Sequence, residues 1–448
     1  MARRRILAAI AHPVRLLPLT FLVLIVLGTI ALMLPFSHLQ GGLADPVDAF
    51  FTSTSAVTVT GLASVDTSTY WSPVGQGIIL VLVEVGGLGI IALATVLGLF
   101  IGGRLGLRTR LVAQADMHVV NIGEVRPLFQ RVAIMMFGFQ AVIAVWLTGR
   151  YRLEYYDDWA TSIWHGAFDA VMAFNNAGFS LNSDSLSGYA GDGLIIIPIC
   201  VGVFIGAMGF PVLAELFSGW RTPDRWTIHT RLTVWGSLVL FAVGFVAFVA
   251  MEWGNPDTLG DLTLAHRLLN GIEGSVMPRS GGLNSFDWGA VNGETQALGT
   301  ILMFIGGGSA STAGGIKVTT FLLLAFVILA ELRGDPEVTI GNRSVGFQVI
   351  RTGLTIALIS VMLVTGTTLV LMALTDFSFD DVLFECTSAF ATAGLSTGIT
   401  SLLPDSAKIV LAALMFVGRV GTIAAASAFI LRRRAPRYHL PEEQPIIG

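Results

Sequence analysis

Four short segments of the chain resemble one another, and each ends in a glycine flanked by small or hydroxylated residues. They share a bulky apolar residue ten positions before the glycine and a Leu or Phe directly after it. Some 24 to 28 residues later each is followed by a second mark, an apolar residue and Gly-x-x-Gly, which in the third copy widens into a glycine-rich run. Two marks in phase predict a fourfold internal repeat. The aligned glycines are Gly61, Gly178, Gly282 and Gly394, in segments 51–63, 168–180, 272–284 and 384–396.

The chain around these segments is apolar enough for a membrane. It is 54% hydrophobic and 12% charged, a composition typical of integral membrane proteins. Eight apolar stretches approach or exceed the roughly 20 residues that cross a bilayer, two per repeat with a glycine segment between them. They lie at about 16–36, 78–101, 132–148, 194–217, 232–251, 297–332, 349–374 and 409–431.

We therefore expect an all-α integral membrane protein of four pseudo-symmetric repeats around a central ion pore. Each repeat would hold a membrane helix, a re-entrant pore helix and a second membrane helix, which makes eight transmembrane helices and four pore helices. The predicted repeats are 1–104, 105–220, 221–335 and 336–448, the third with a broken second helix and a gating loop, the fourth with a cytoplasmic C-terminal tail.

Basic residues predict the orientation, because Lys and Arg accumulate in short cytoplasmic loops. Arginines precede the first span, follow the last, and fill alternate connections, as with Arg104, Arg225 and Arg333. Both termini are predicted to be cytoplasmic, in the cell inner (plasma) membrane, and the four glycine segments enter from outside. The N-terminal apolar run is too long for a signal-peptide core and is predicted to be a retained helix.

Acidic residues are predicted near the start of each pore helix. Asp48, Asp169, Glu273 and Glu385 would suit the positive N-terminus of a half-helix. They would either only stabilise these helix starts or also raise the cation concentration at the pore mouth.

The glycine segments predict a row of backbone carbonyls. Irregular backbone at membrane depth must be buried in protein or line water, and rings of carbonyls replace the hydration shell of potassium. Thr58-Val59-Thr60-Gly61 is close to the Thr-Val-Gly pattern of potassium channels. We expect the side chain of Arg279 to point away from the axis and brace its loop. The predicted ion-binding filter residues are Thr58, Val59, Thr60, Gly61, Asn175, Asn176, Ala177, Gly178, Arg279, Ser280, Gly281, Gly282, Ala391, Thr392, Ala393 and Gly394.

Two features of the second membrane helices predict a gate. The run 306–315 is too rich in Gly, Ser and Thr for a regular helix, since each Gly costs about 1 kcal/mol relative to Ala; it would be either a pore-lining loop or a kinked, static helix. Arg419 lies within a span and needs a polar cavity, a partner or an interface to snorkel to. The predicted gate residues are Gly306, Gly307, Gly308, Ser309, Ala310, Ser311, Thr312, Ala313, Gly314, Gly315, Lys317 and Arg419.

The whole pattern resembles the superfamily of TrkH, KtrB and plant HKT potassium transporters. The resemblance rests on the four repeats, on Gly306 to Lys317 and on Gly418-Arg419-Val420-Gly421, and the length resembles the KtrB branch. It implies that four filter glycines go with potassium selectivity, that the loop obstructs the pore beneath the filter, and that Arg419 is an electrostatic barrier there. The stretch Pro278 to Gly281 departs from the family pattern.

The resemblance also implies the partners. It predicts a homodimer in the lipid bilayer, resting on a cytoplasmic ring of RCK-type, KtrA-like subunits that bind ATP or ADP. Potassium would be the cargo, with sodium left open as an activator, and no nucleic acid is expected. An ion-coupled secondary transporter with broken helices remains the alternative.

No catalytic constellation is present in the sequence, so an enzyme is not expected. Five further residues of note receive plain interpretations. Glu84 faces either a packed interface or the ion path. Glu215 and Glu331 are repeat-equivalent residues with a structural or a subunit-contact role, and Cys200 and Cys386 are small packing residues.

Overall fold

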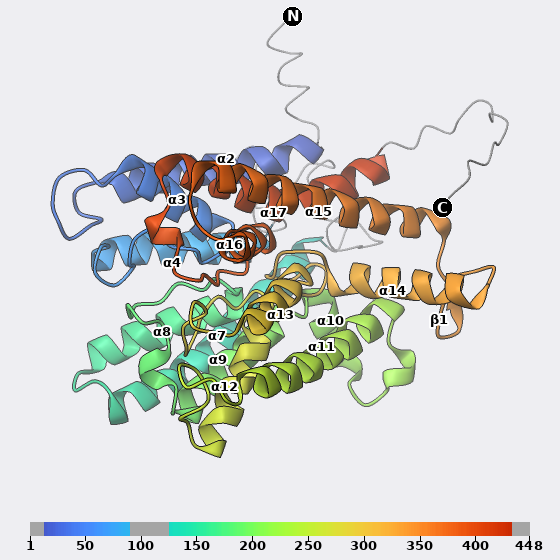
Figure 1. The fold of residues 1–448 in the computed structure, drawn as a ribbon, viewed down its shortest axis with the longest axis horizontal. Coiled ribbons are helices and arrows are strands. Elements are labelled where there is room, and N and C mark those ends of the chain that lie inside the picture. The colour runs from blue at the N-terminus through green and yellow to red at the C-terminus, as the bar shows by residue number, and fades with distance from the viewer. Residues whose placement is uncertain (1–12, 90–124, 432–448) are drawn as a thin grey trace, which may run out of the picture.

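The computed structural model describes residues 13–89 and 125–431, and these are almost entirely helical (Figure 1). A two-stranded antiparallel hairpin is the one sheet among them. The helices are α2 (Pro13–Met33), α3 (Pro46–Val57), α4 (Pro73–Gly87), α7 (Val125–Glu154), α8 (Trp159–Asn175), α9 (Gly193–Gly206), α10 (Phe210–Gly219), α11 (Ile228–Glu252), α12 (Leu264–Val276), α13 (Gly293–Phe304), α14 (Val318–Arg333), α15 (Phe347–Leu374), α16 (Phe379–Ala391) and α17 (Asp405–Leu431), with short 3-10 turns η2 (Ser187–Tyr189), η3 (Pro223–Arg225) and η4 (Thr400–Leu402) and strands β1 (Thr339–Ile340) and β2 (Arg343–Ser344).

A short, buried helix follows each of the four helices α2, α7, α11 and α15. These short helices, α3, α8, α12 and α16, each begin at a side-chain cap, which satisfies N–H groups that a helix leaves unpaired at its start. The caps are Asp45, Asp158, Thr263 and Ser378. At Asp158 the bond from the Thr161 N–H also lowers the pKa of the carboxyl. Each short helix therefore starts at a polar edge and ends inside the protein.

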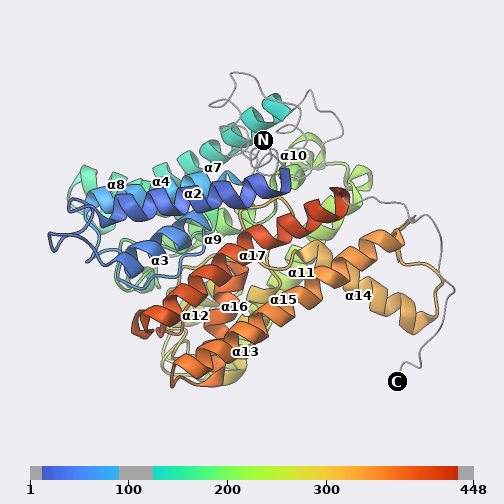
Figure 2. The same cartoon turned by 90° about the horizontal axis from the view of Figure 1, so that it is seen from above.

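The short helices are held in a closed ring by their neighbours. Each contacts the helix before it, as α2 contacts α3, and also the apolar helix that directly follows the preceding short helix around the ring. Thus α4 contacts α8, α9 contacts α12, α13 contacts α16, and α17 returns to contact α3. Figure 2 shows α17 lying beside α15 and reaching α2 and α3. The first and last parts of the chain therefore close the ring.

Each predicted apolar stretch coincides with a helix or a helix pair. Three described helices, α7, α11 and α15, are long and apolar enough to cross a membrane, and the bent pair α9 and α10 would make a fourth; α2 and α4 are apolar but shorter. The prediction of one continuous span over 194–217 is wrong, because α9 and α10 meet at 101°. The predicted break within 297–332 is confirmed between α13 and α14. The end of the span 78–101, the basic connection within 90–124 and both basic termini lie outside the described residues.

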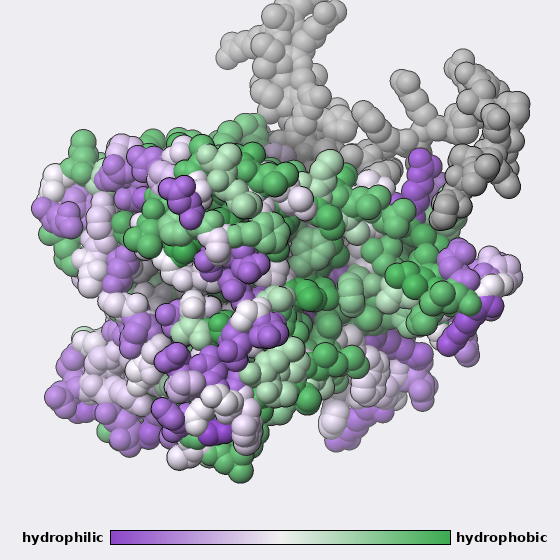
Figure 3. All heavy atoms as spheres, viewed as in Figure 1, coloured by the Kyte–Doolittle hydropathy of each residue, from purple (hydrophilic) through white to green (hydrophobic). Residues whose placement is uncertain are grey.

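The outer helices carry apolar side chains on their exposed faces. On α7 and α15 the side chains of Val145, Ile134 and Met362 are 75%, 72% and 65% exposed, as expected of helices that face lipid rather than water. Figure 3 shows hydrophobic residues over the middle of the molecule and hydrophilic residues at both ends, where α3 and α8 begin and around β1. The short helices thus enter from one of two polar ends.

Candidate functional site

The four glycines of the repeated segments meet at one place. A Cβ added at Gly61 or at Gly282 would lie 2.8 or 2.6 Å from the Cα of Gly178. One added at Gly394 would lie 3.2 Å from the Cα of Gly61 and 3.0 Å from that of Gly282. The four glycines therefore surround one point in space, arranged around it in the same order as in the sequence. No side chain fits at this point.

Backbone carbonyls of the residues before these glycines reach the same place. A Cβ added at Gly282 would lie 2.8 Å from the carbonyl oxygen of Ala393, and Cβ atoms at Gly61 and Gly394 would collide with the oxygens of Ala177 and Thr60. Sequence reasoning brought these segments together through the repeat, and the structure brings their backbones into direct contact.

All four loops share one backbone geometry. Each has a left-handed residue two positions before its glycine, and the glycine is itself left-handed with φ between 69° and 95°. Val59, Asn176, Ser280 and Thr392 adopt φ of 56°, 61°, 73° and 46°. For a β-branched residue such as Val59 or Thr392 this is an unusual conformation. All four residues are in the predicted filter segments, but their side chains differ and gave no sequence signal for the left-handed conformation.

The third loop is hydrogen-bonded differently from the others. The N–H groups of Thr60, Ala177 and Ala393 donate to carbonyls five residues earlier, at 2.8 to 2.9 Å. In the third loop Gly281 N–H donates only four residues back, to Met277 at 2.7 Å. The departure of Pro278 to Gly281 from the family pattern therefore corresponds to a local change in backbone pairing.

Arg279 turns its side chain away from the point where the glycines meet. Its guanidinium donates to the carbonyl and to the hydroxyl of Ser237 on α11, both at 3.0 Å, and lies 6.0 Å from the ring centre of Phe204. The prediction that this side chain points away from the centre of the ring and braces its loop is confirmed.

The prediction for the acidic residues is wrong in three of four cases. Asp48 is in the first turn of α3 and pairs with Lys408 at 2.8 Å. Asp169, Glu273 and Glu385 lie in the body of their helices and are at most 1% exposed. Buried carboxylates of this kind bind neighbouring protein groups rather than ions at a mouth.

The glycine-rich run crosses beneath the glycine ring as an irregular loop between α13 and α14. Thr312 Oγ1 donates to Asn176 Oδ1 at 2.9 Å, and Gly314 N–H donates to Ser280 Oγ at 3.3 Å. A Cβ added at Gly314 would lie 2.5 Å from the carbonyl oxygen of Ala391. The run, 306–315, therefore contacts three of the four glycine loops, and the prediction that it leaves the helical conformation is confirmed.

Two basic residues bind carbonyls of this loop. The Arg419 side chain, 7% exposed on α17, donates to the carbonyl of Thr312. Lys317 Nζ donates to the carbonyl of Ala313 at 2.6 Å. Both residues predicted to act with the loop thus hold its backbone.

The bend between α9 and α10 is a third support for the loop, and sequence reasoning missed it. Gly308 N–H donates to the Ala207 carbonyl at 2.7 Å, and Phe210 N–H donates to the Ala310 carbonyl at 3.2 Å. Gly209, between these two contacts, has a φ of 93°. The second repeat mark, Gly206-x-x-Gly209, was the signal that could have predicted this break.

The first glycine of the second mark has a packing role. A Cβ added at Gly86, Gly206 or Gly418 would collide with a backbone carbonyl at the end of the short helix in the same repeat. The carbonyls belong to Val57, Phe174 and Phe390, each four positions before the glycine of its repeated segment. The second mark therefore lets a membrane helix approach the loop it supports.

Glu84 takes the packed-interface interpretation. Its Oε2 accepts from Asn175 at 2.7 Å and from Gln140 on α7 at 3.0 Å. It ties the second glycine loop to two neighbouring helices. Cys200 and Cys386 are buried free thiols, in keeping with a packing role.

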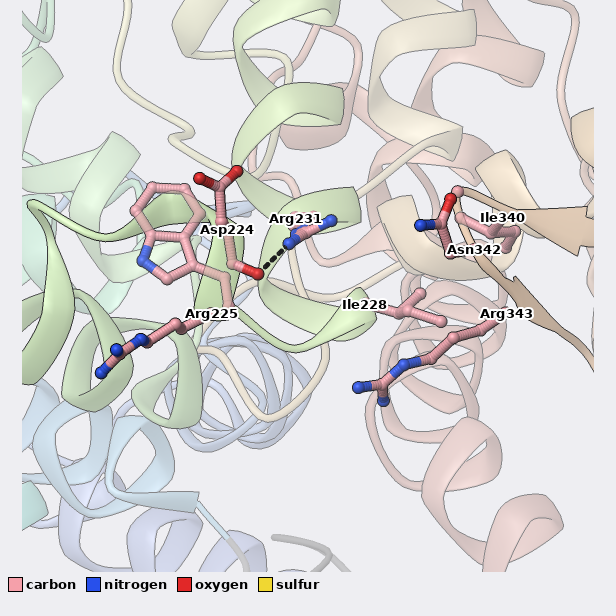
Figure 4. Close-up of a pocket in the computed structure, with 9 residues that line it drawn as sticks. Asp224, Arg225, Ile228, Arg231, Ile340, Asn342 and Arg343 are labelled. Carbon is pink, nitrogen blue, oxygen red and sulfur yellow. Dashed lines mark hydrogen bonds between the residues drawn. The ribbon is translucent and has the colours of Figure 1, made fainter.

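At the opposite end of the bundle lies a basic cleft of about 450 Å³, between η3, the start of α11 and the β1–β2 hairpin. Figure 4 shows Arg231 and Arg343 on its two sides, with Arg231 donating to the carbonyl of Asp224. This cleft joins two of the connections predicted to be cytoplasmic.

Comparisons with known proteins agree on one family. The family model TrkH, described as a cation transport protein, matches residues 3–437. The chain is 35% identical to the Ktr system potassium uptake protein B of Bacillus subtilis, over 92% of this chain and 91% of that protein. It is 33% identical to the protein of the same name from Vibrio alginolyticus, over 97% and 94%. The crystal structure of the potassium transporter TrkH from Vibrio parahaemolyticus has the same fold, with a TM-score of 0.67, 21% identity, and 92% and 84% coverage.

Proposed function

Because the chain belongs to the TrkH family of cation transport proteins, we propose that it takes up potassium through a carbonyl-lined filter gated by the loop beneath it. The observation that carries the proposal is the ring of four glycines, in which carbonyls of the preceding residues lie against the neighbouring loops. Rings of backbone carbonyl oxygens replace the water that a potassium ion sheds on entry. The relatives named as potassium uptake proteins support the choice of ion.

The filter is formed by residues 58–61, 175–178, 279–282 and 391–394. Only backbone reaches the axis, so the side chain of Arg279 does not oppose a cation there. All four filter positions are glycine, which supports potassium rather than sodium as the main cargo. Sodium as an activator remains part of the proposal to be tested.

The gate is the loop 306–315 together with Lys317 and Arg419. In the structure the loop contacts three filter loops and is held by Arg419. A positive charge at this point opposes cations that leave the filter. Opening requires the loop to exchange these contacts for others, so the closed state is set by a small number of hydrogen bonds.

The proposed assembly is a homodimer in the plasma membrane, with both termini cytoplasmic. A ring of RCK-type, KtrA-like subunits would bind ATP or ADP and shift the loop between its closed and open forms. The name "Ktr system" of the relatives supports a protein that works with other subunits. The basic cleft around Arg231 and Arg343 is a surface where such a ring could bind.

Cation flux into liposomes containing the purified protein tests the proposal. We expect uptake of potassium and rubidium but little sodium or lithium. Gly61→Ser should lower this selectivity, and deletion of residues 308–313 should raise flux. Absence of potassium flux under every gradient, or flux that always requires a second solute or proton gradient, would overturn the pore and favour the secondary transporter.

A further inference from the structure

Glu273 and Glu385 occupy the same position in two repeats. Each lies nine residues before its filter glycine, in the body of α12 or α16, and each is 0% exposed. A buried carboxylate is strongly unfavourable unless hydrogen bonds replace its hydration. Their partners therefore indicate what these side chains are for.

Both carboxylates bind the segment that leaves the filter. Glu273 accepts from the N–H of Ser285 at 2.9 Å, and Glu385 accepts from the N–H of Thr397 at 3.2 Å. Ser285 and Thr397 each lie three residues after the filter glycine. The same backbone-to-carboxylate bond thus occurs independently in two repeats.

Hydroxyl groups donate the remaining hydrogen bonds to each carboxylate. The Ser285 hydroxyl also donates to Glu273. The hydroxyls of Ser396 and Thr400 donate to Glu385, the latter at 2.8 Å. Each glutamate is therefore a clamp that joins the pore helix before the filter to the irregular segment after it.

Among the residues that the structure describes, the first two repeats have no such clamp. Their corresponding residues are Thr52 and Asp169. The Thr52 hydroxyl has no hydrogen-bond partner among the described residues. Asp169, one methylene shorter than Glu, accepts from the Tyr151 hydroxyl on α7 at 2.6 Å, and its other oxygen is unpaired in the part of the chain that the structure describes. The ring is thus clamped on one half only.

We propose that Glu273 and Glu385 are positioning residues that fix the diameter of the filter through its third and fourth loops, and so contribute to the discrimination between potassium and sodium. This inference rests on the proposed function. In the third and fourth loops the glycine lies between the end of the pore helix and the segment bound by the glutamate. The carbonyls of these two loops therefore cannot move inward around a smaller ion without breaking the buried bond from Ser285 to Glu273 or from Thr397 to Glu385. Such bonds are strong because water does not compete for them.

The test compares Glu273→Gln and Glu385→Gln with wild type in liposomes, measuring the potassium-to-sodium permeability ratio. The amide nitrogen of Gln would face a hydroxyl donor, so each change weakens the clamp while preserving its size. We expect the ratio to fall about tenfold, equivalent to about 1.4 kcal/mol, while potassium still permeates.

Glu252→Gln is the matched control. Glu252 is also 0% exposed, and it accepts from Thr258 at 2.6 Å, Asn255 at 2.7 Å and the Asn292 N–H at 2.9 Å, none of them in a filter loop. This variant should keep the wild-type ratio. An equal fall in the ratio for Glu252→Gln would mean general loosening of the fold and would overturn the proposal.

An unchanged ratio in both clamp variants, with potassium flux intact, would also overturn it and leave the proposed function standing. If the glutamate variants do not fold, Ser285→Ala and Thr400→Ala remove one hydroxyl donor from each clamp, and the ratio should fall about threefold; no fall would refute the clamp. A wild-type protein that carries no potassium would instead remove the proposed function itself.

Discussion

Replacing Arg419 with Gln is expected to increase potassium flux in the absence of any regulatory subunit. In the structure the guanidinium donates to the Thr312 carbonyl at the centre of the gate loop. A hydrogen bond from a charged donor contributes about 1.5 to 3 kcal/mol, and each 1.4 kcal/mol is a tenfold change in an equilibrium. The closed-to-open ratio should therefore fall by about 10-fold to 100-fold. Loss of the positive charge beneath the filter acts in the same direction.

The assay is potassium flux into liposomes, normalised to the amount of folded protein in each preparation. Arg267→Gln is the control, because Arg267 also donates to carbonyls, those of Leu262 at 2.9 Å and Trp253 at 3.1 Å, which belong to neither the gate loop nor a glycine segment. This control should leave flux at the wild-type level. Wild-type flux in Arg419→Gln, with the protein folded, would refute the idea that this arginine holds the loop closed.

Three further changes follow from the same structure. Gly178→Ala places a Cβ 2.8 Å from the Cα of Gly282, at a residue with a φ of 69°. Potassium flux should fall at least about tenfold, because the left-handed conformation costs about 1–2 kcal/mol for alanine and the Cβ clashes with Gly282. Normal flux would contradict the close contact between these glycines. Gly308→Ala places a Cβ 2.8 Å from Thr233 Cγ2, and flux without a partner should rise as the loop is displaced, whereas unchanged flux would argue against its closed position. Lys408→Met removes the 2.8 Å ion pair with Asp48 and should lower the free energy of unfolding, measured by thermal denaturation, by about 1 kcal/mol. The decrease should be smaller at high salt, and a decrease that does not depend on salt would exclude the ion pair as its cause.

Much of the fold could be predicted because the repeated segments and the apolar stretches have about the same lengths as the helices they form. The glycine at each filter position was visible because only glycine combines a left-handed backbone with contact to another chain segment, as at Gly61 and Gly282. The residues that support the filter were harder to predict. Glu273 and Glu385 look like helix-start acids until the helix bounds are known, since their partners lie beyond the filter in the sequence.

The bend at Gly209 was missed for a different reason. A 24-residue apolar stretch reads as one span by length, and hydropathy carries no information on where a carbonyl will bind a loop from another repeat. Only the two hydrogen bonds to that loop, from Gly308 to the Ala207 carbonyl and from Phe210 to the Ala310 carbonyl, make the break necessary. Predicting it would have required treating the Gly-x-x-Gly mark of the second repeat as equivalent to the broken third.

The contact between α17 and α3 has a consequence for biosynthesis. Lys408 and Asp48, which join the two ends of the ring, are 360 positions apart in the chain. Contacts between such distant segments form late, because the intervening chain must first be ordered. The ring of glycine loops is therefore completed only when the last part of the chain has been made, so a ribosome-bound or truncated chain lacks one side of the proposed pore.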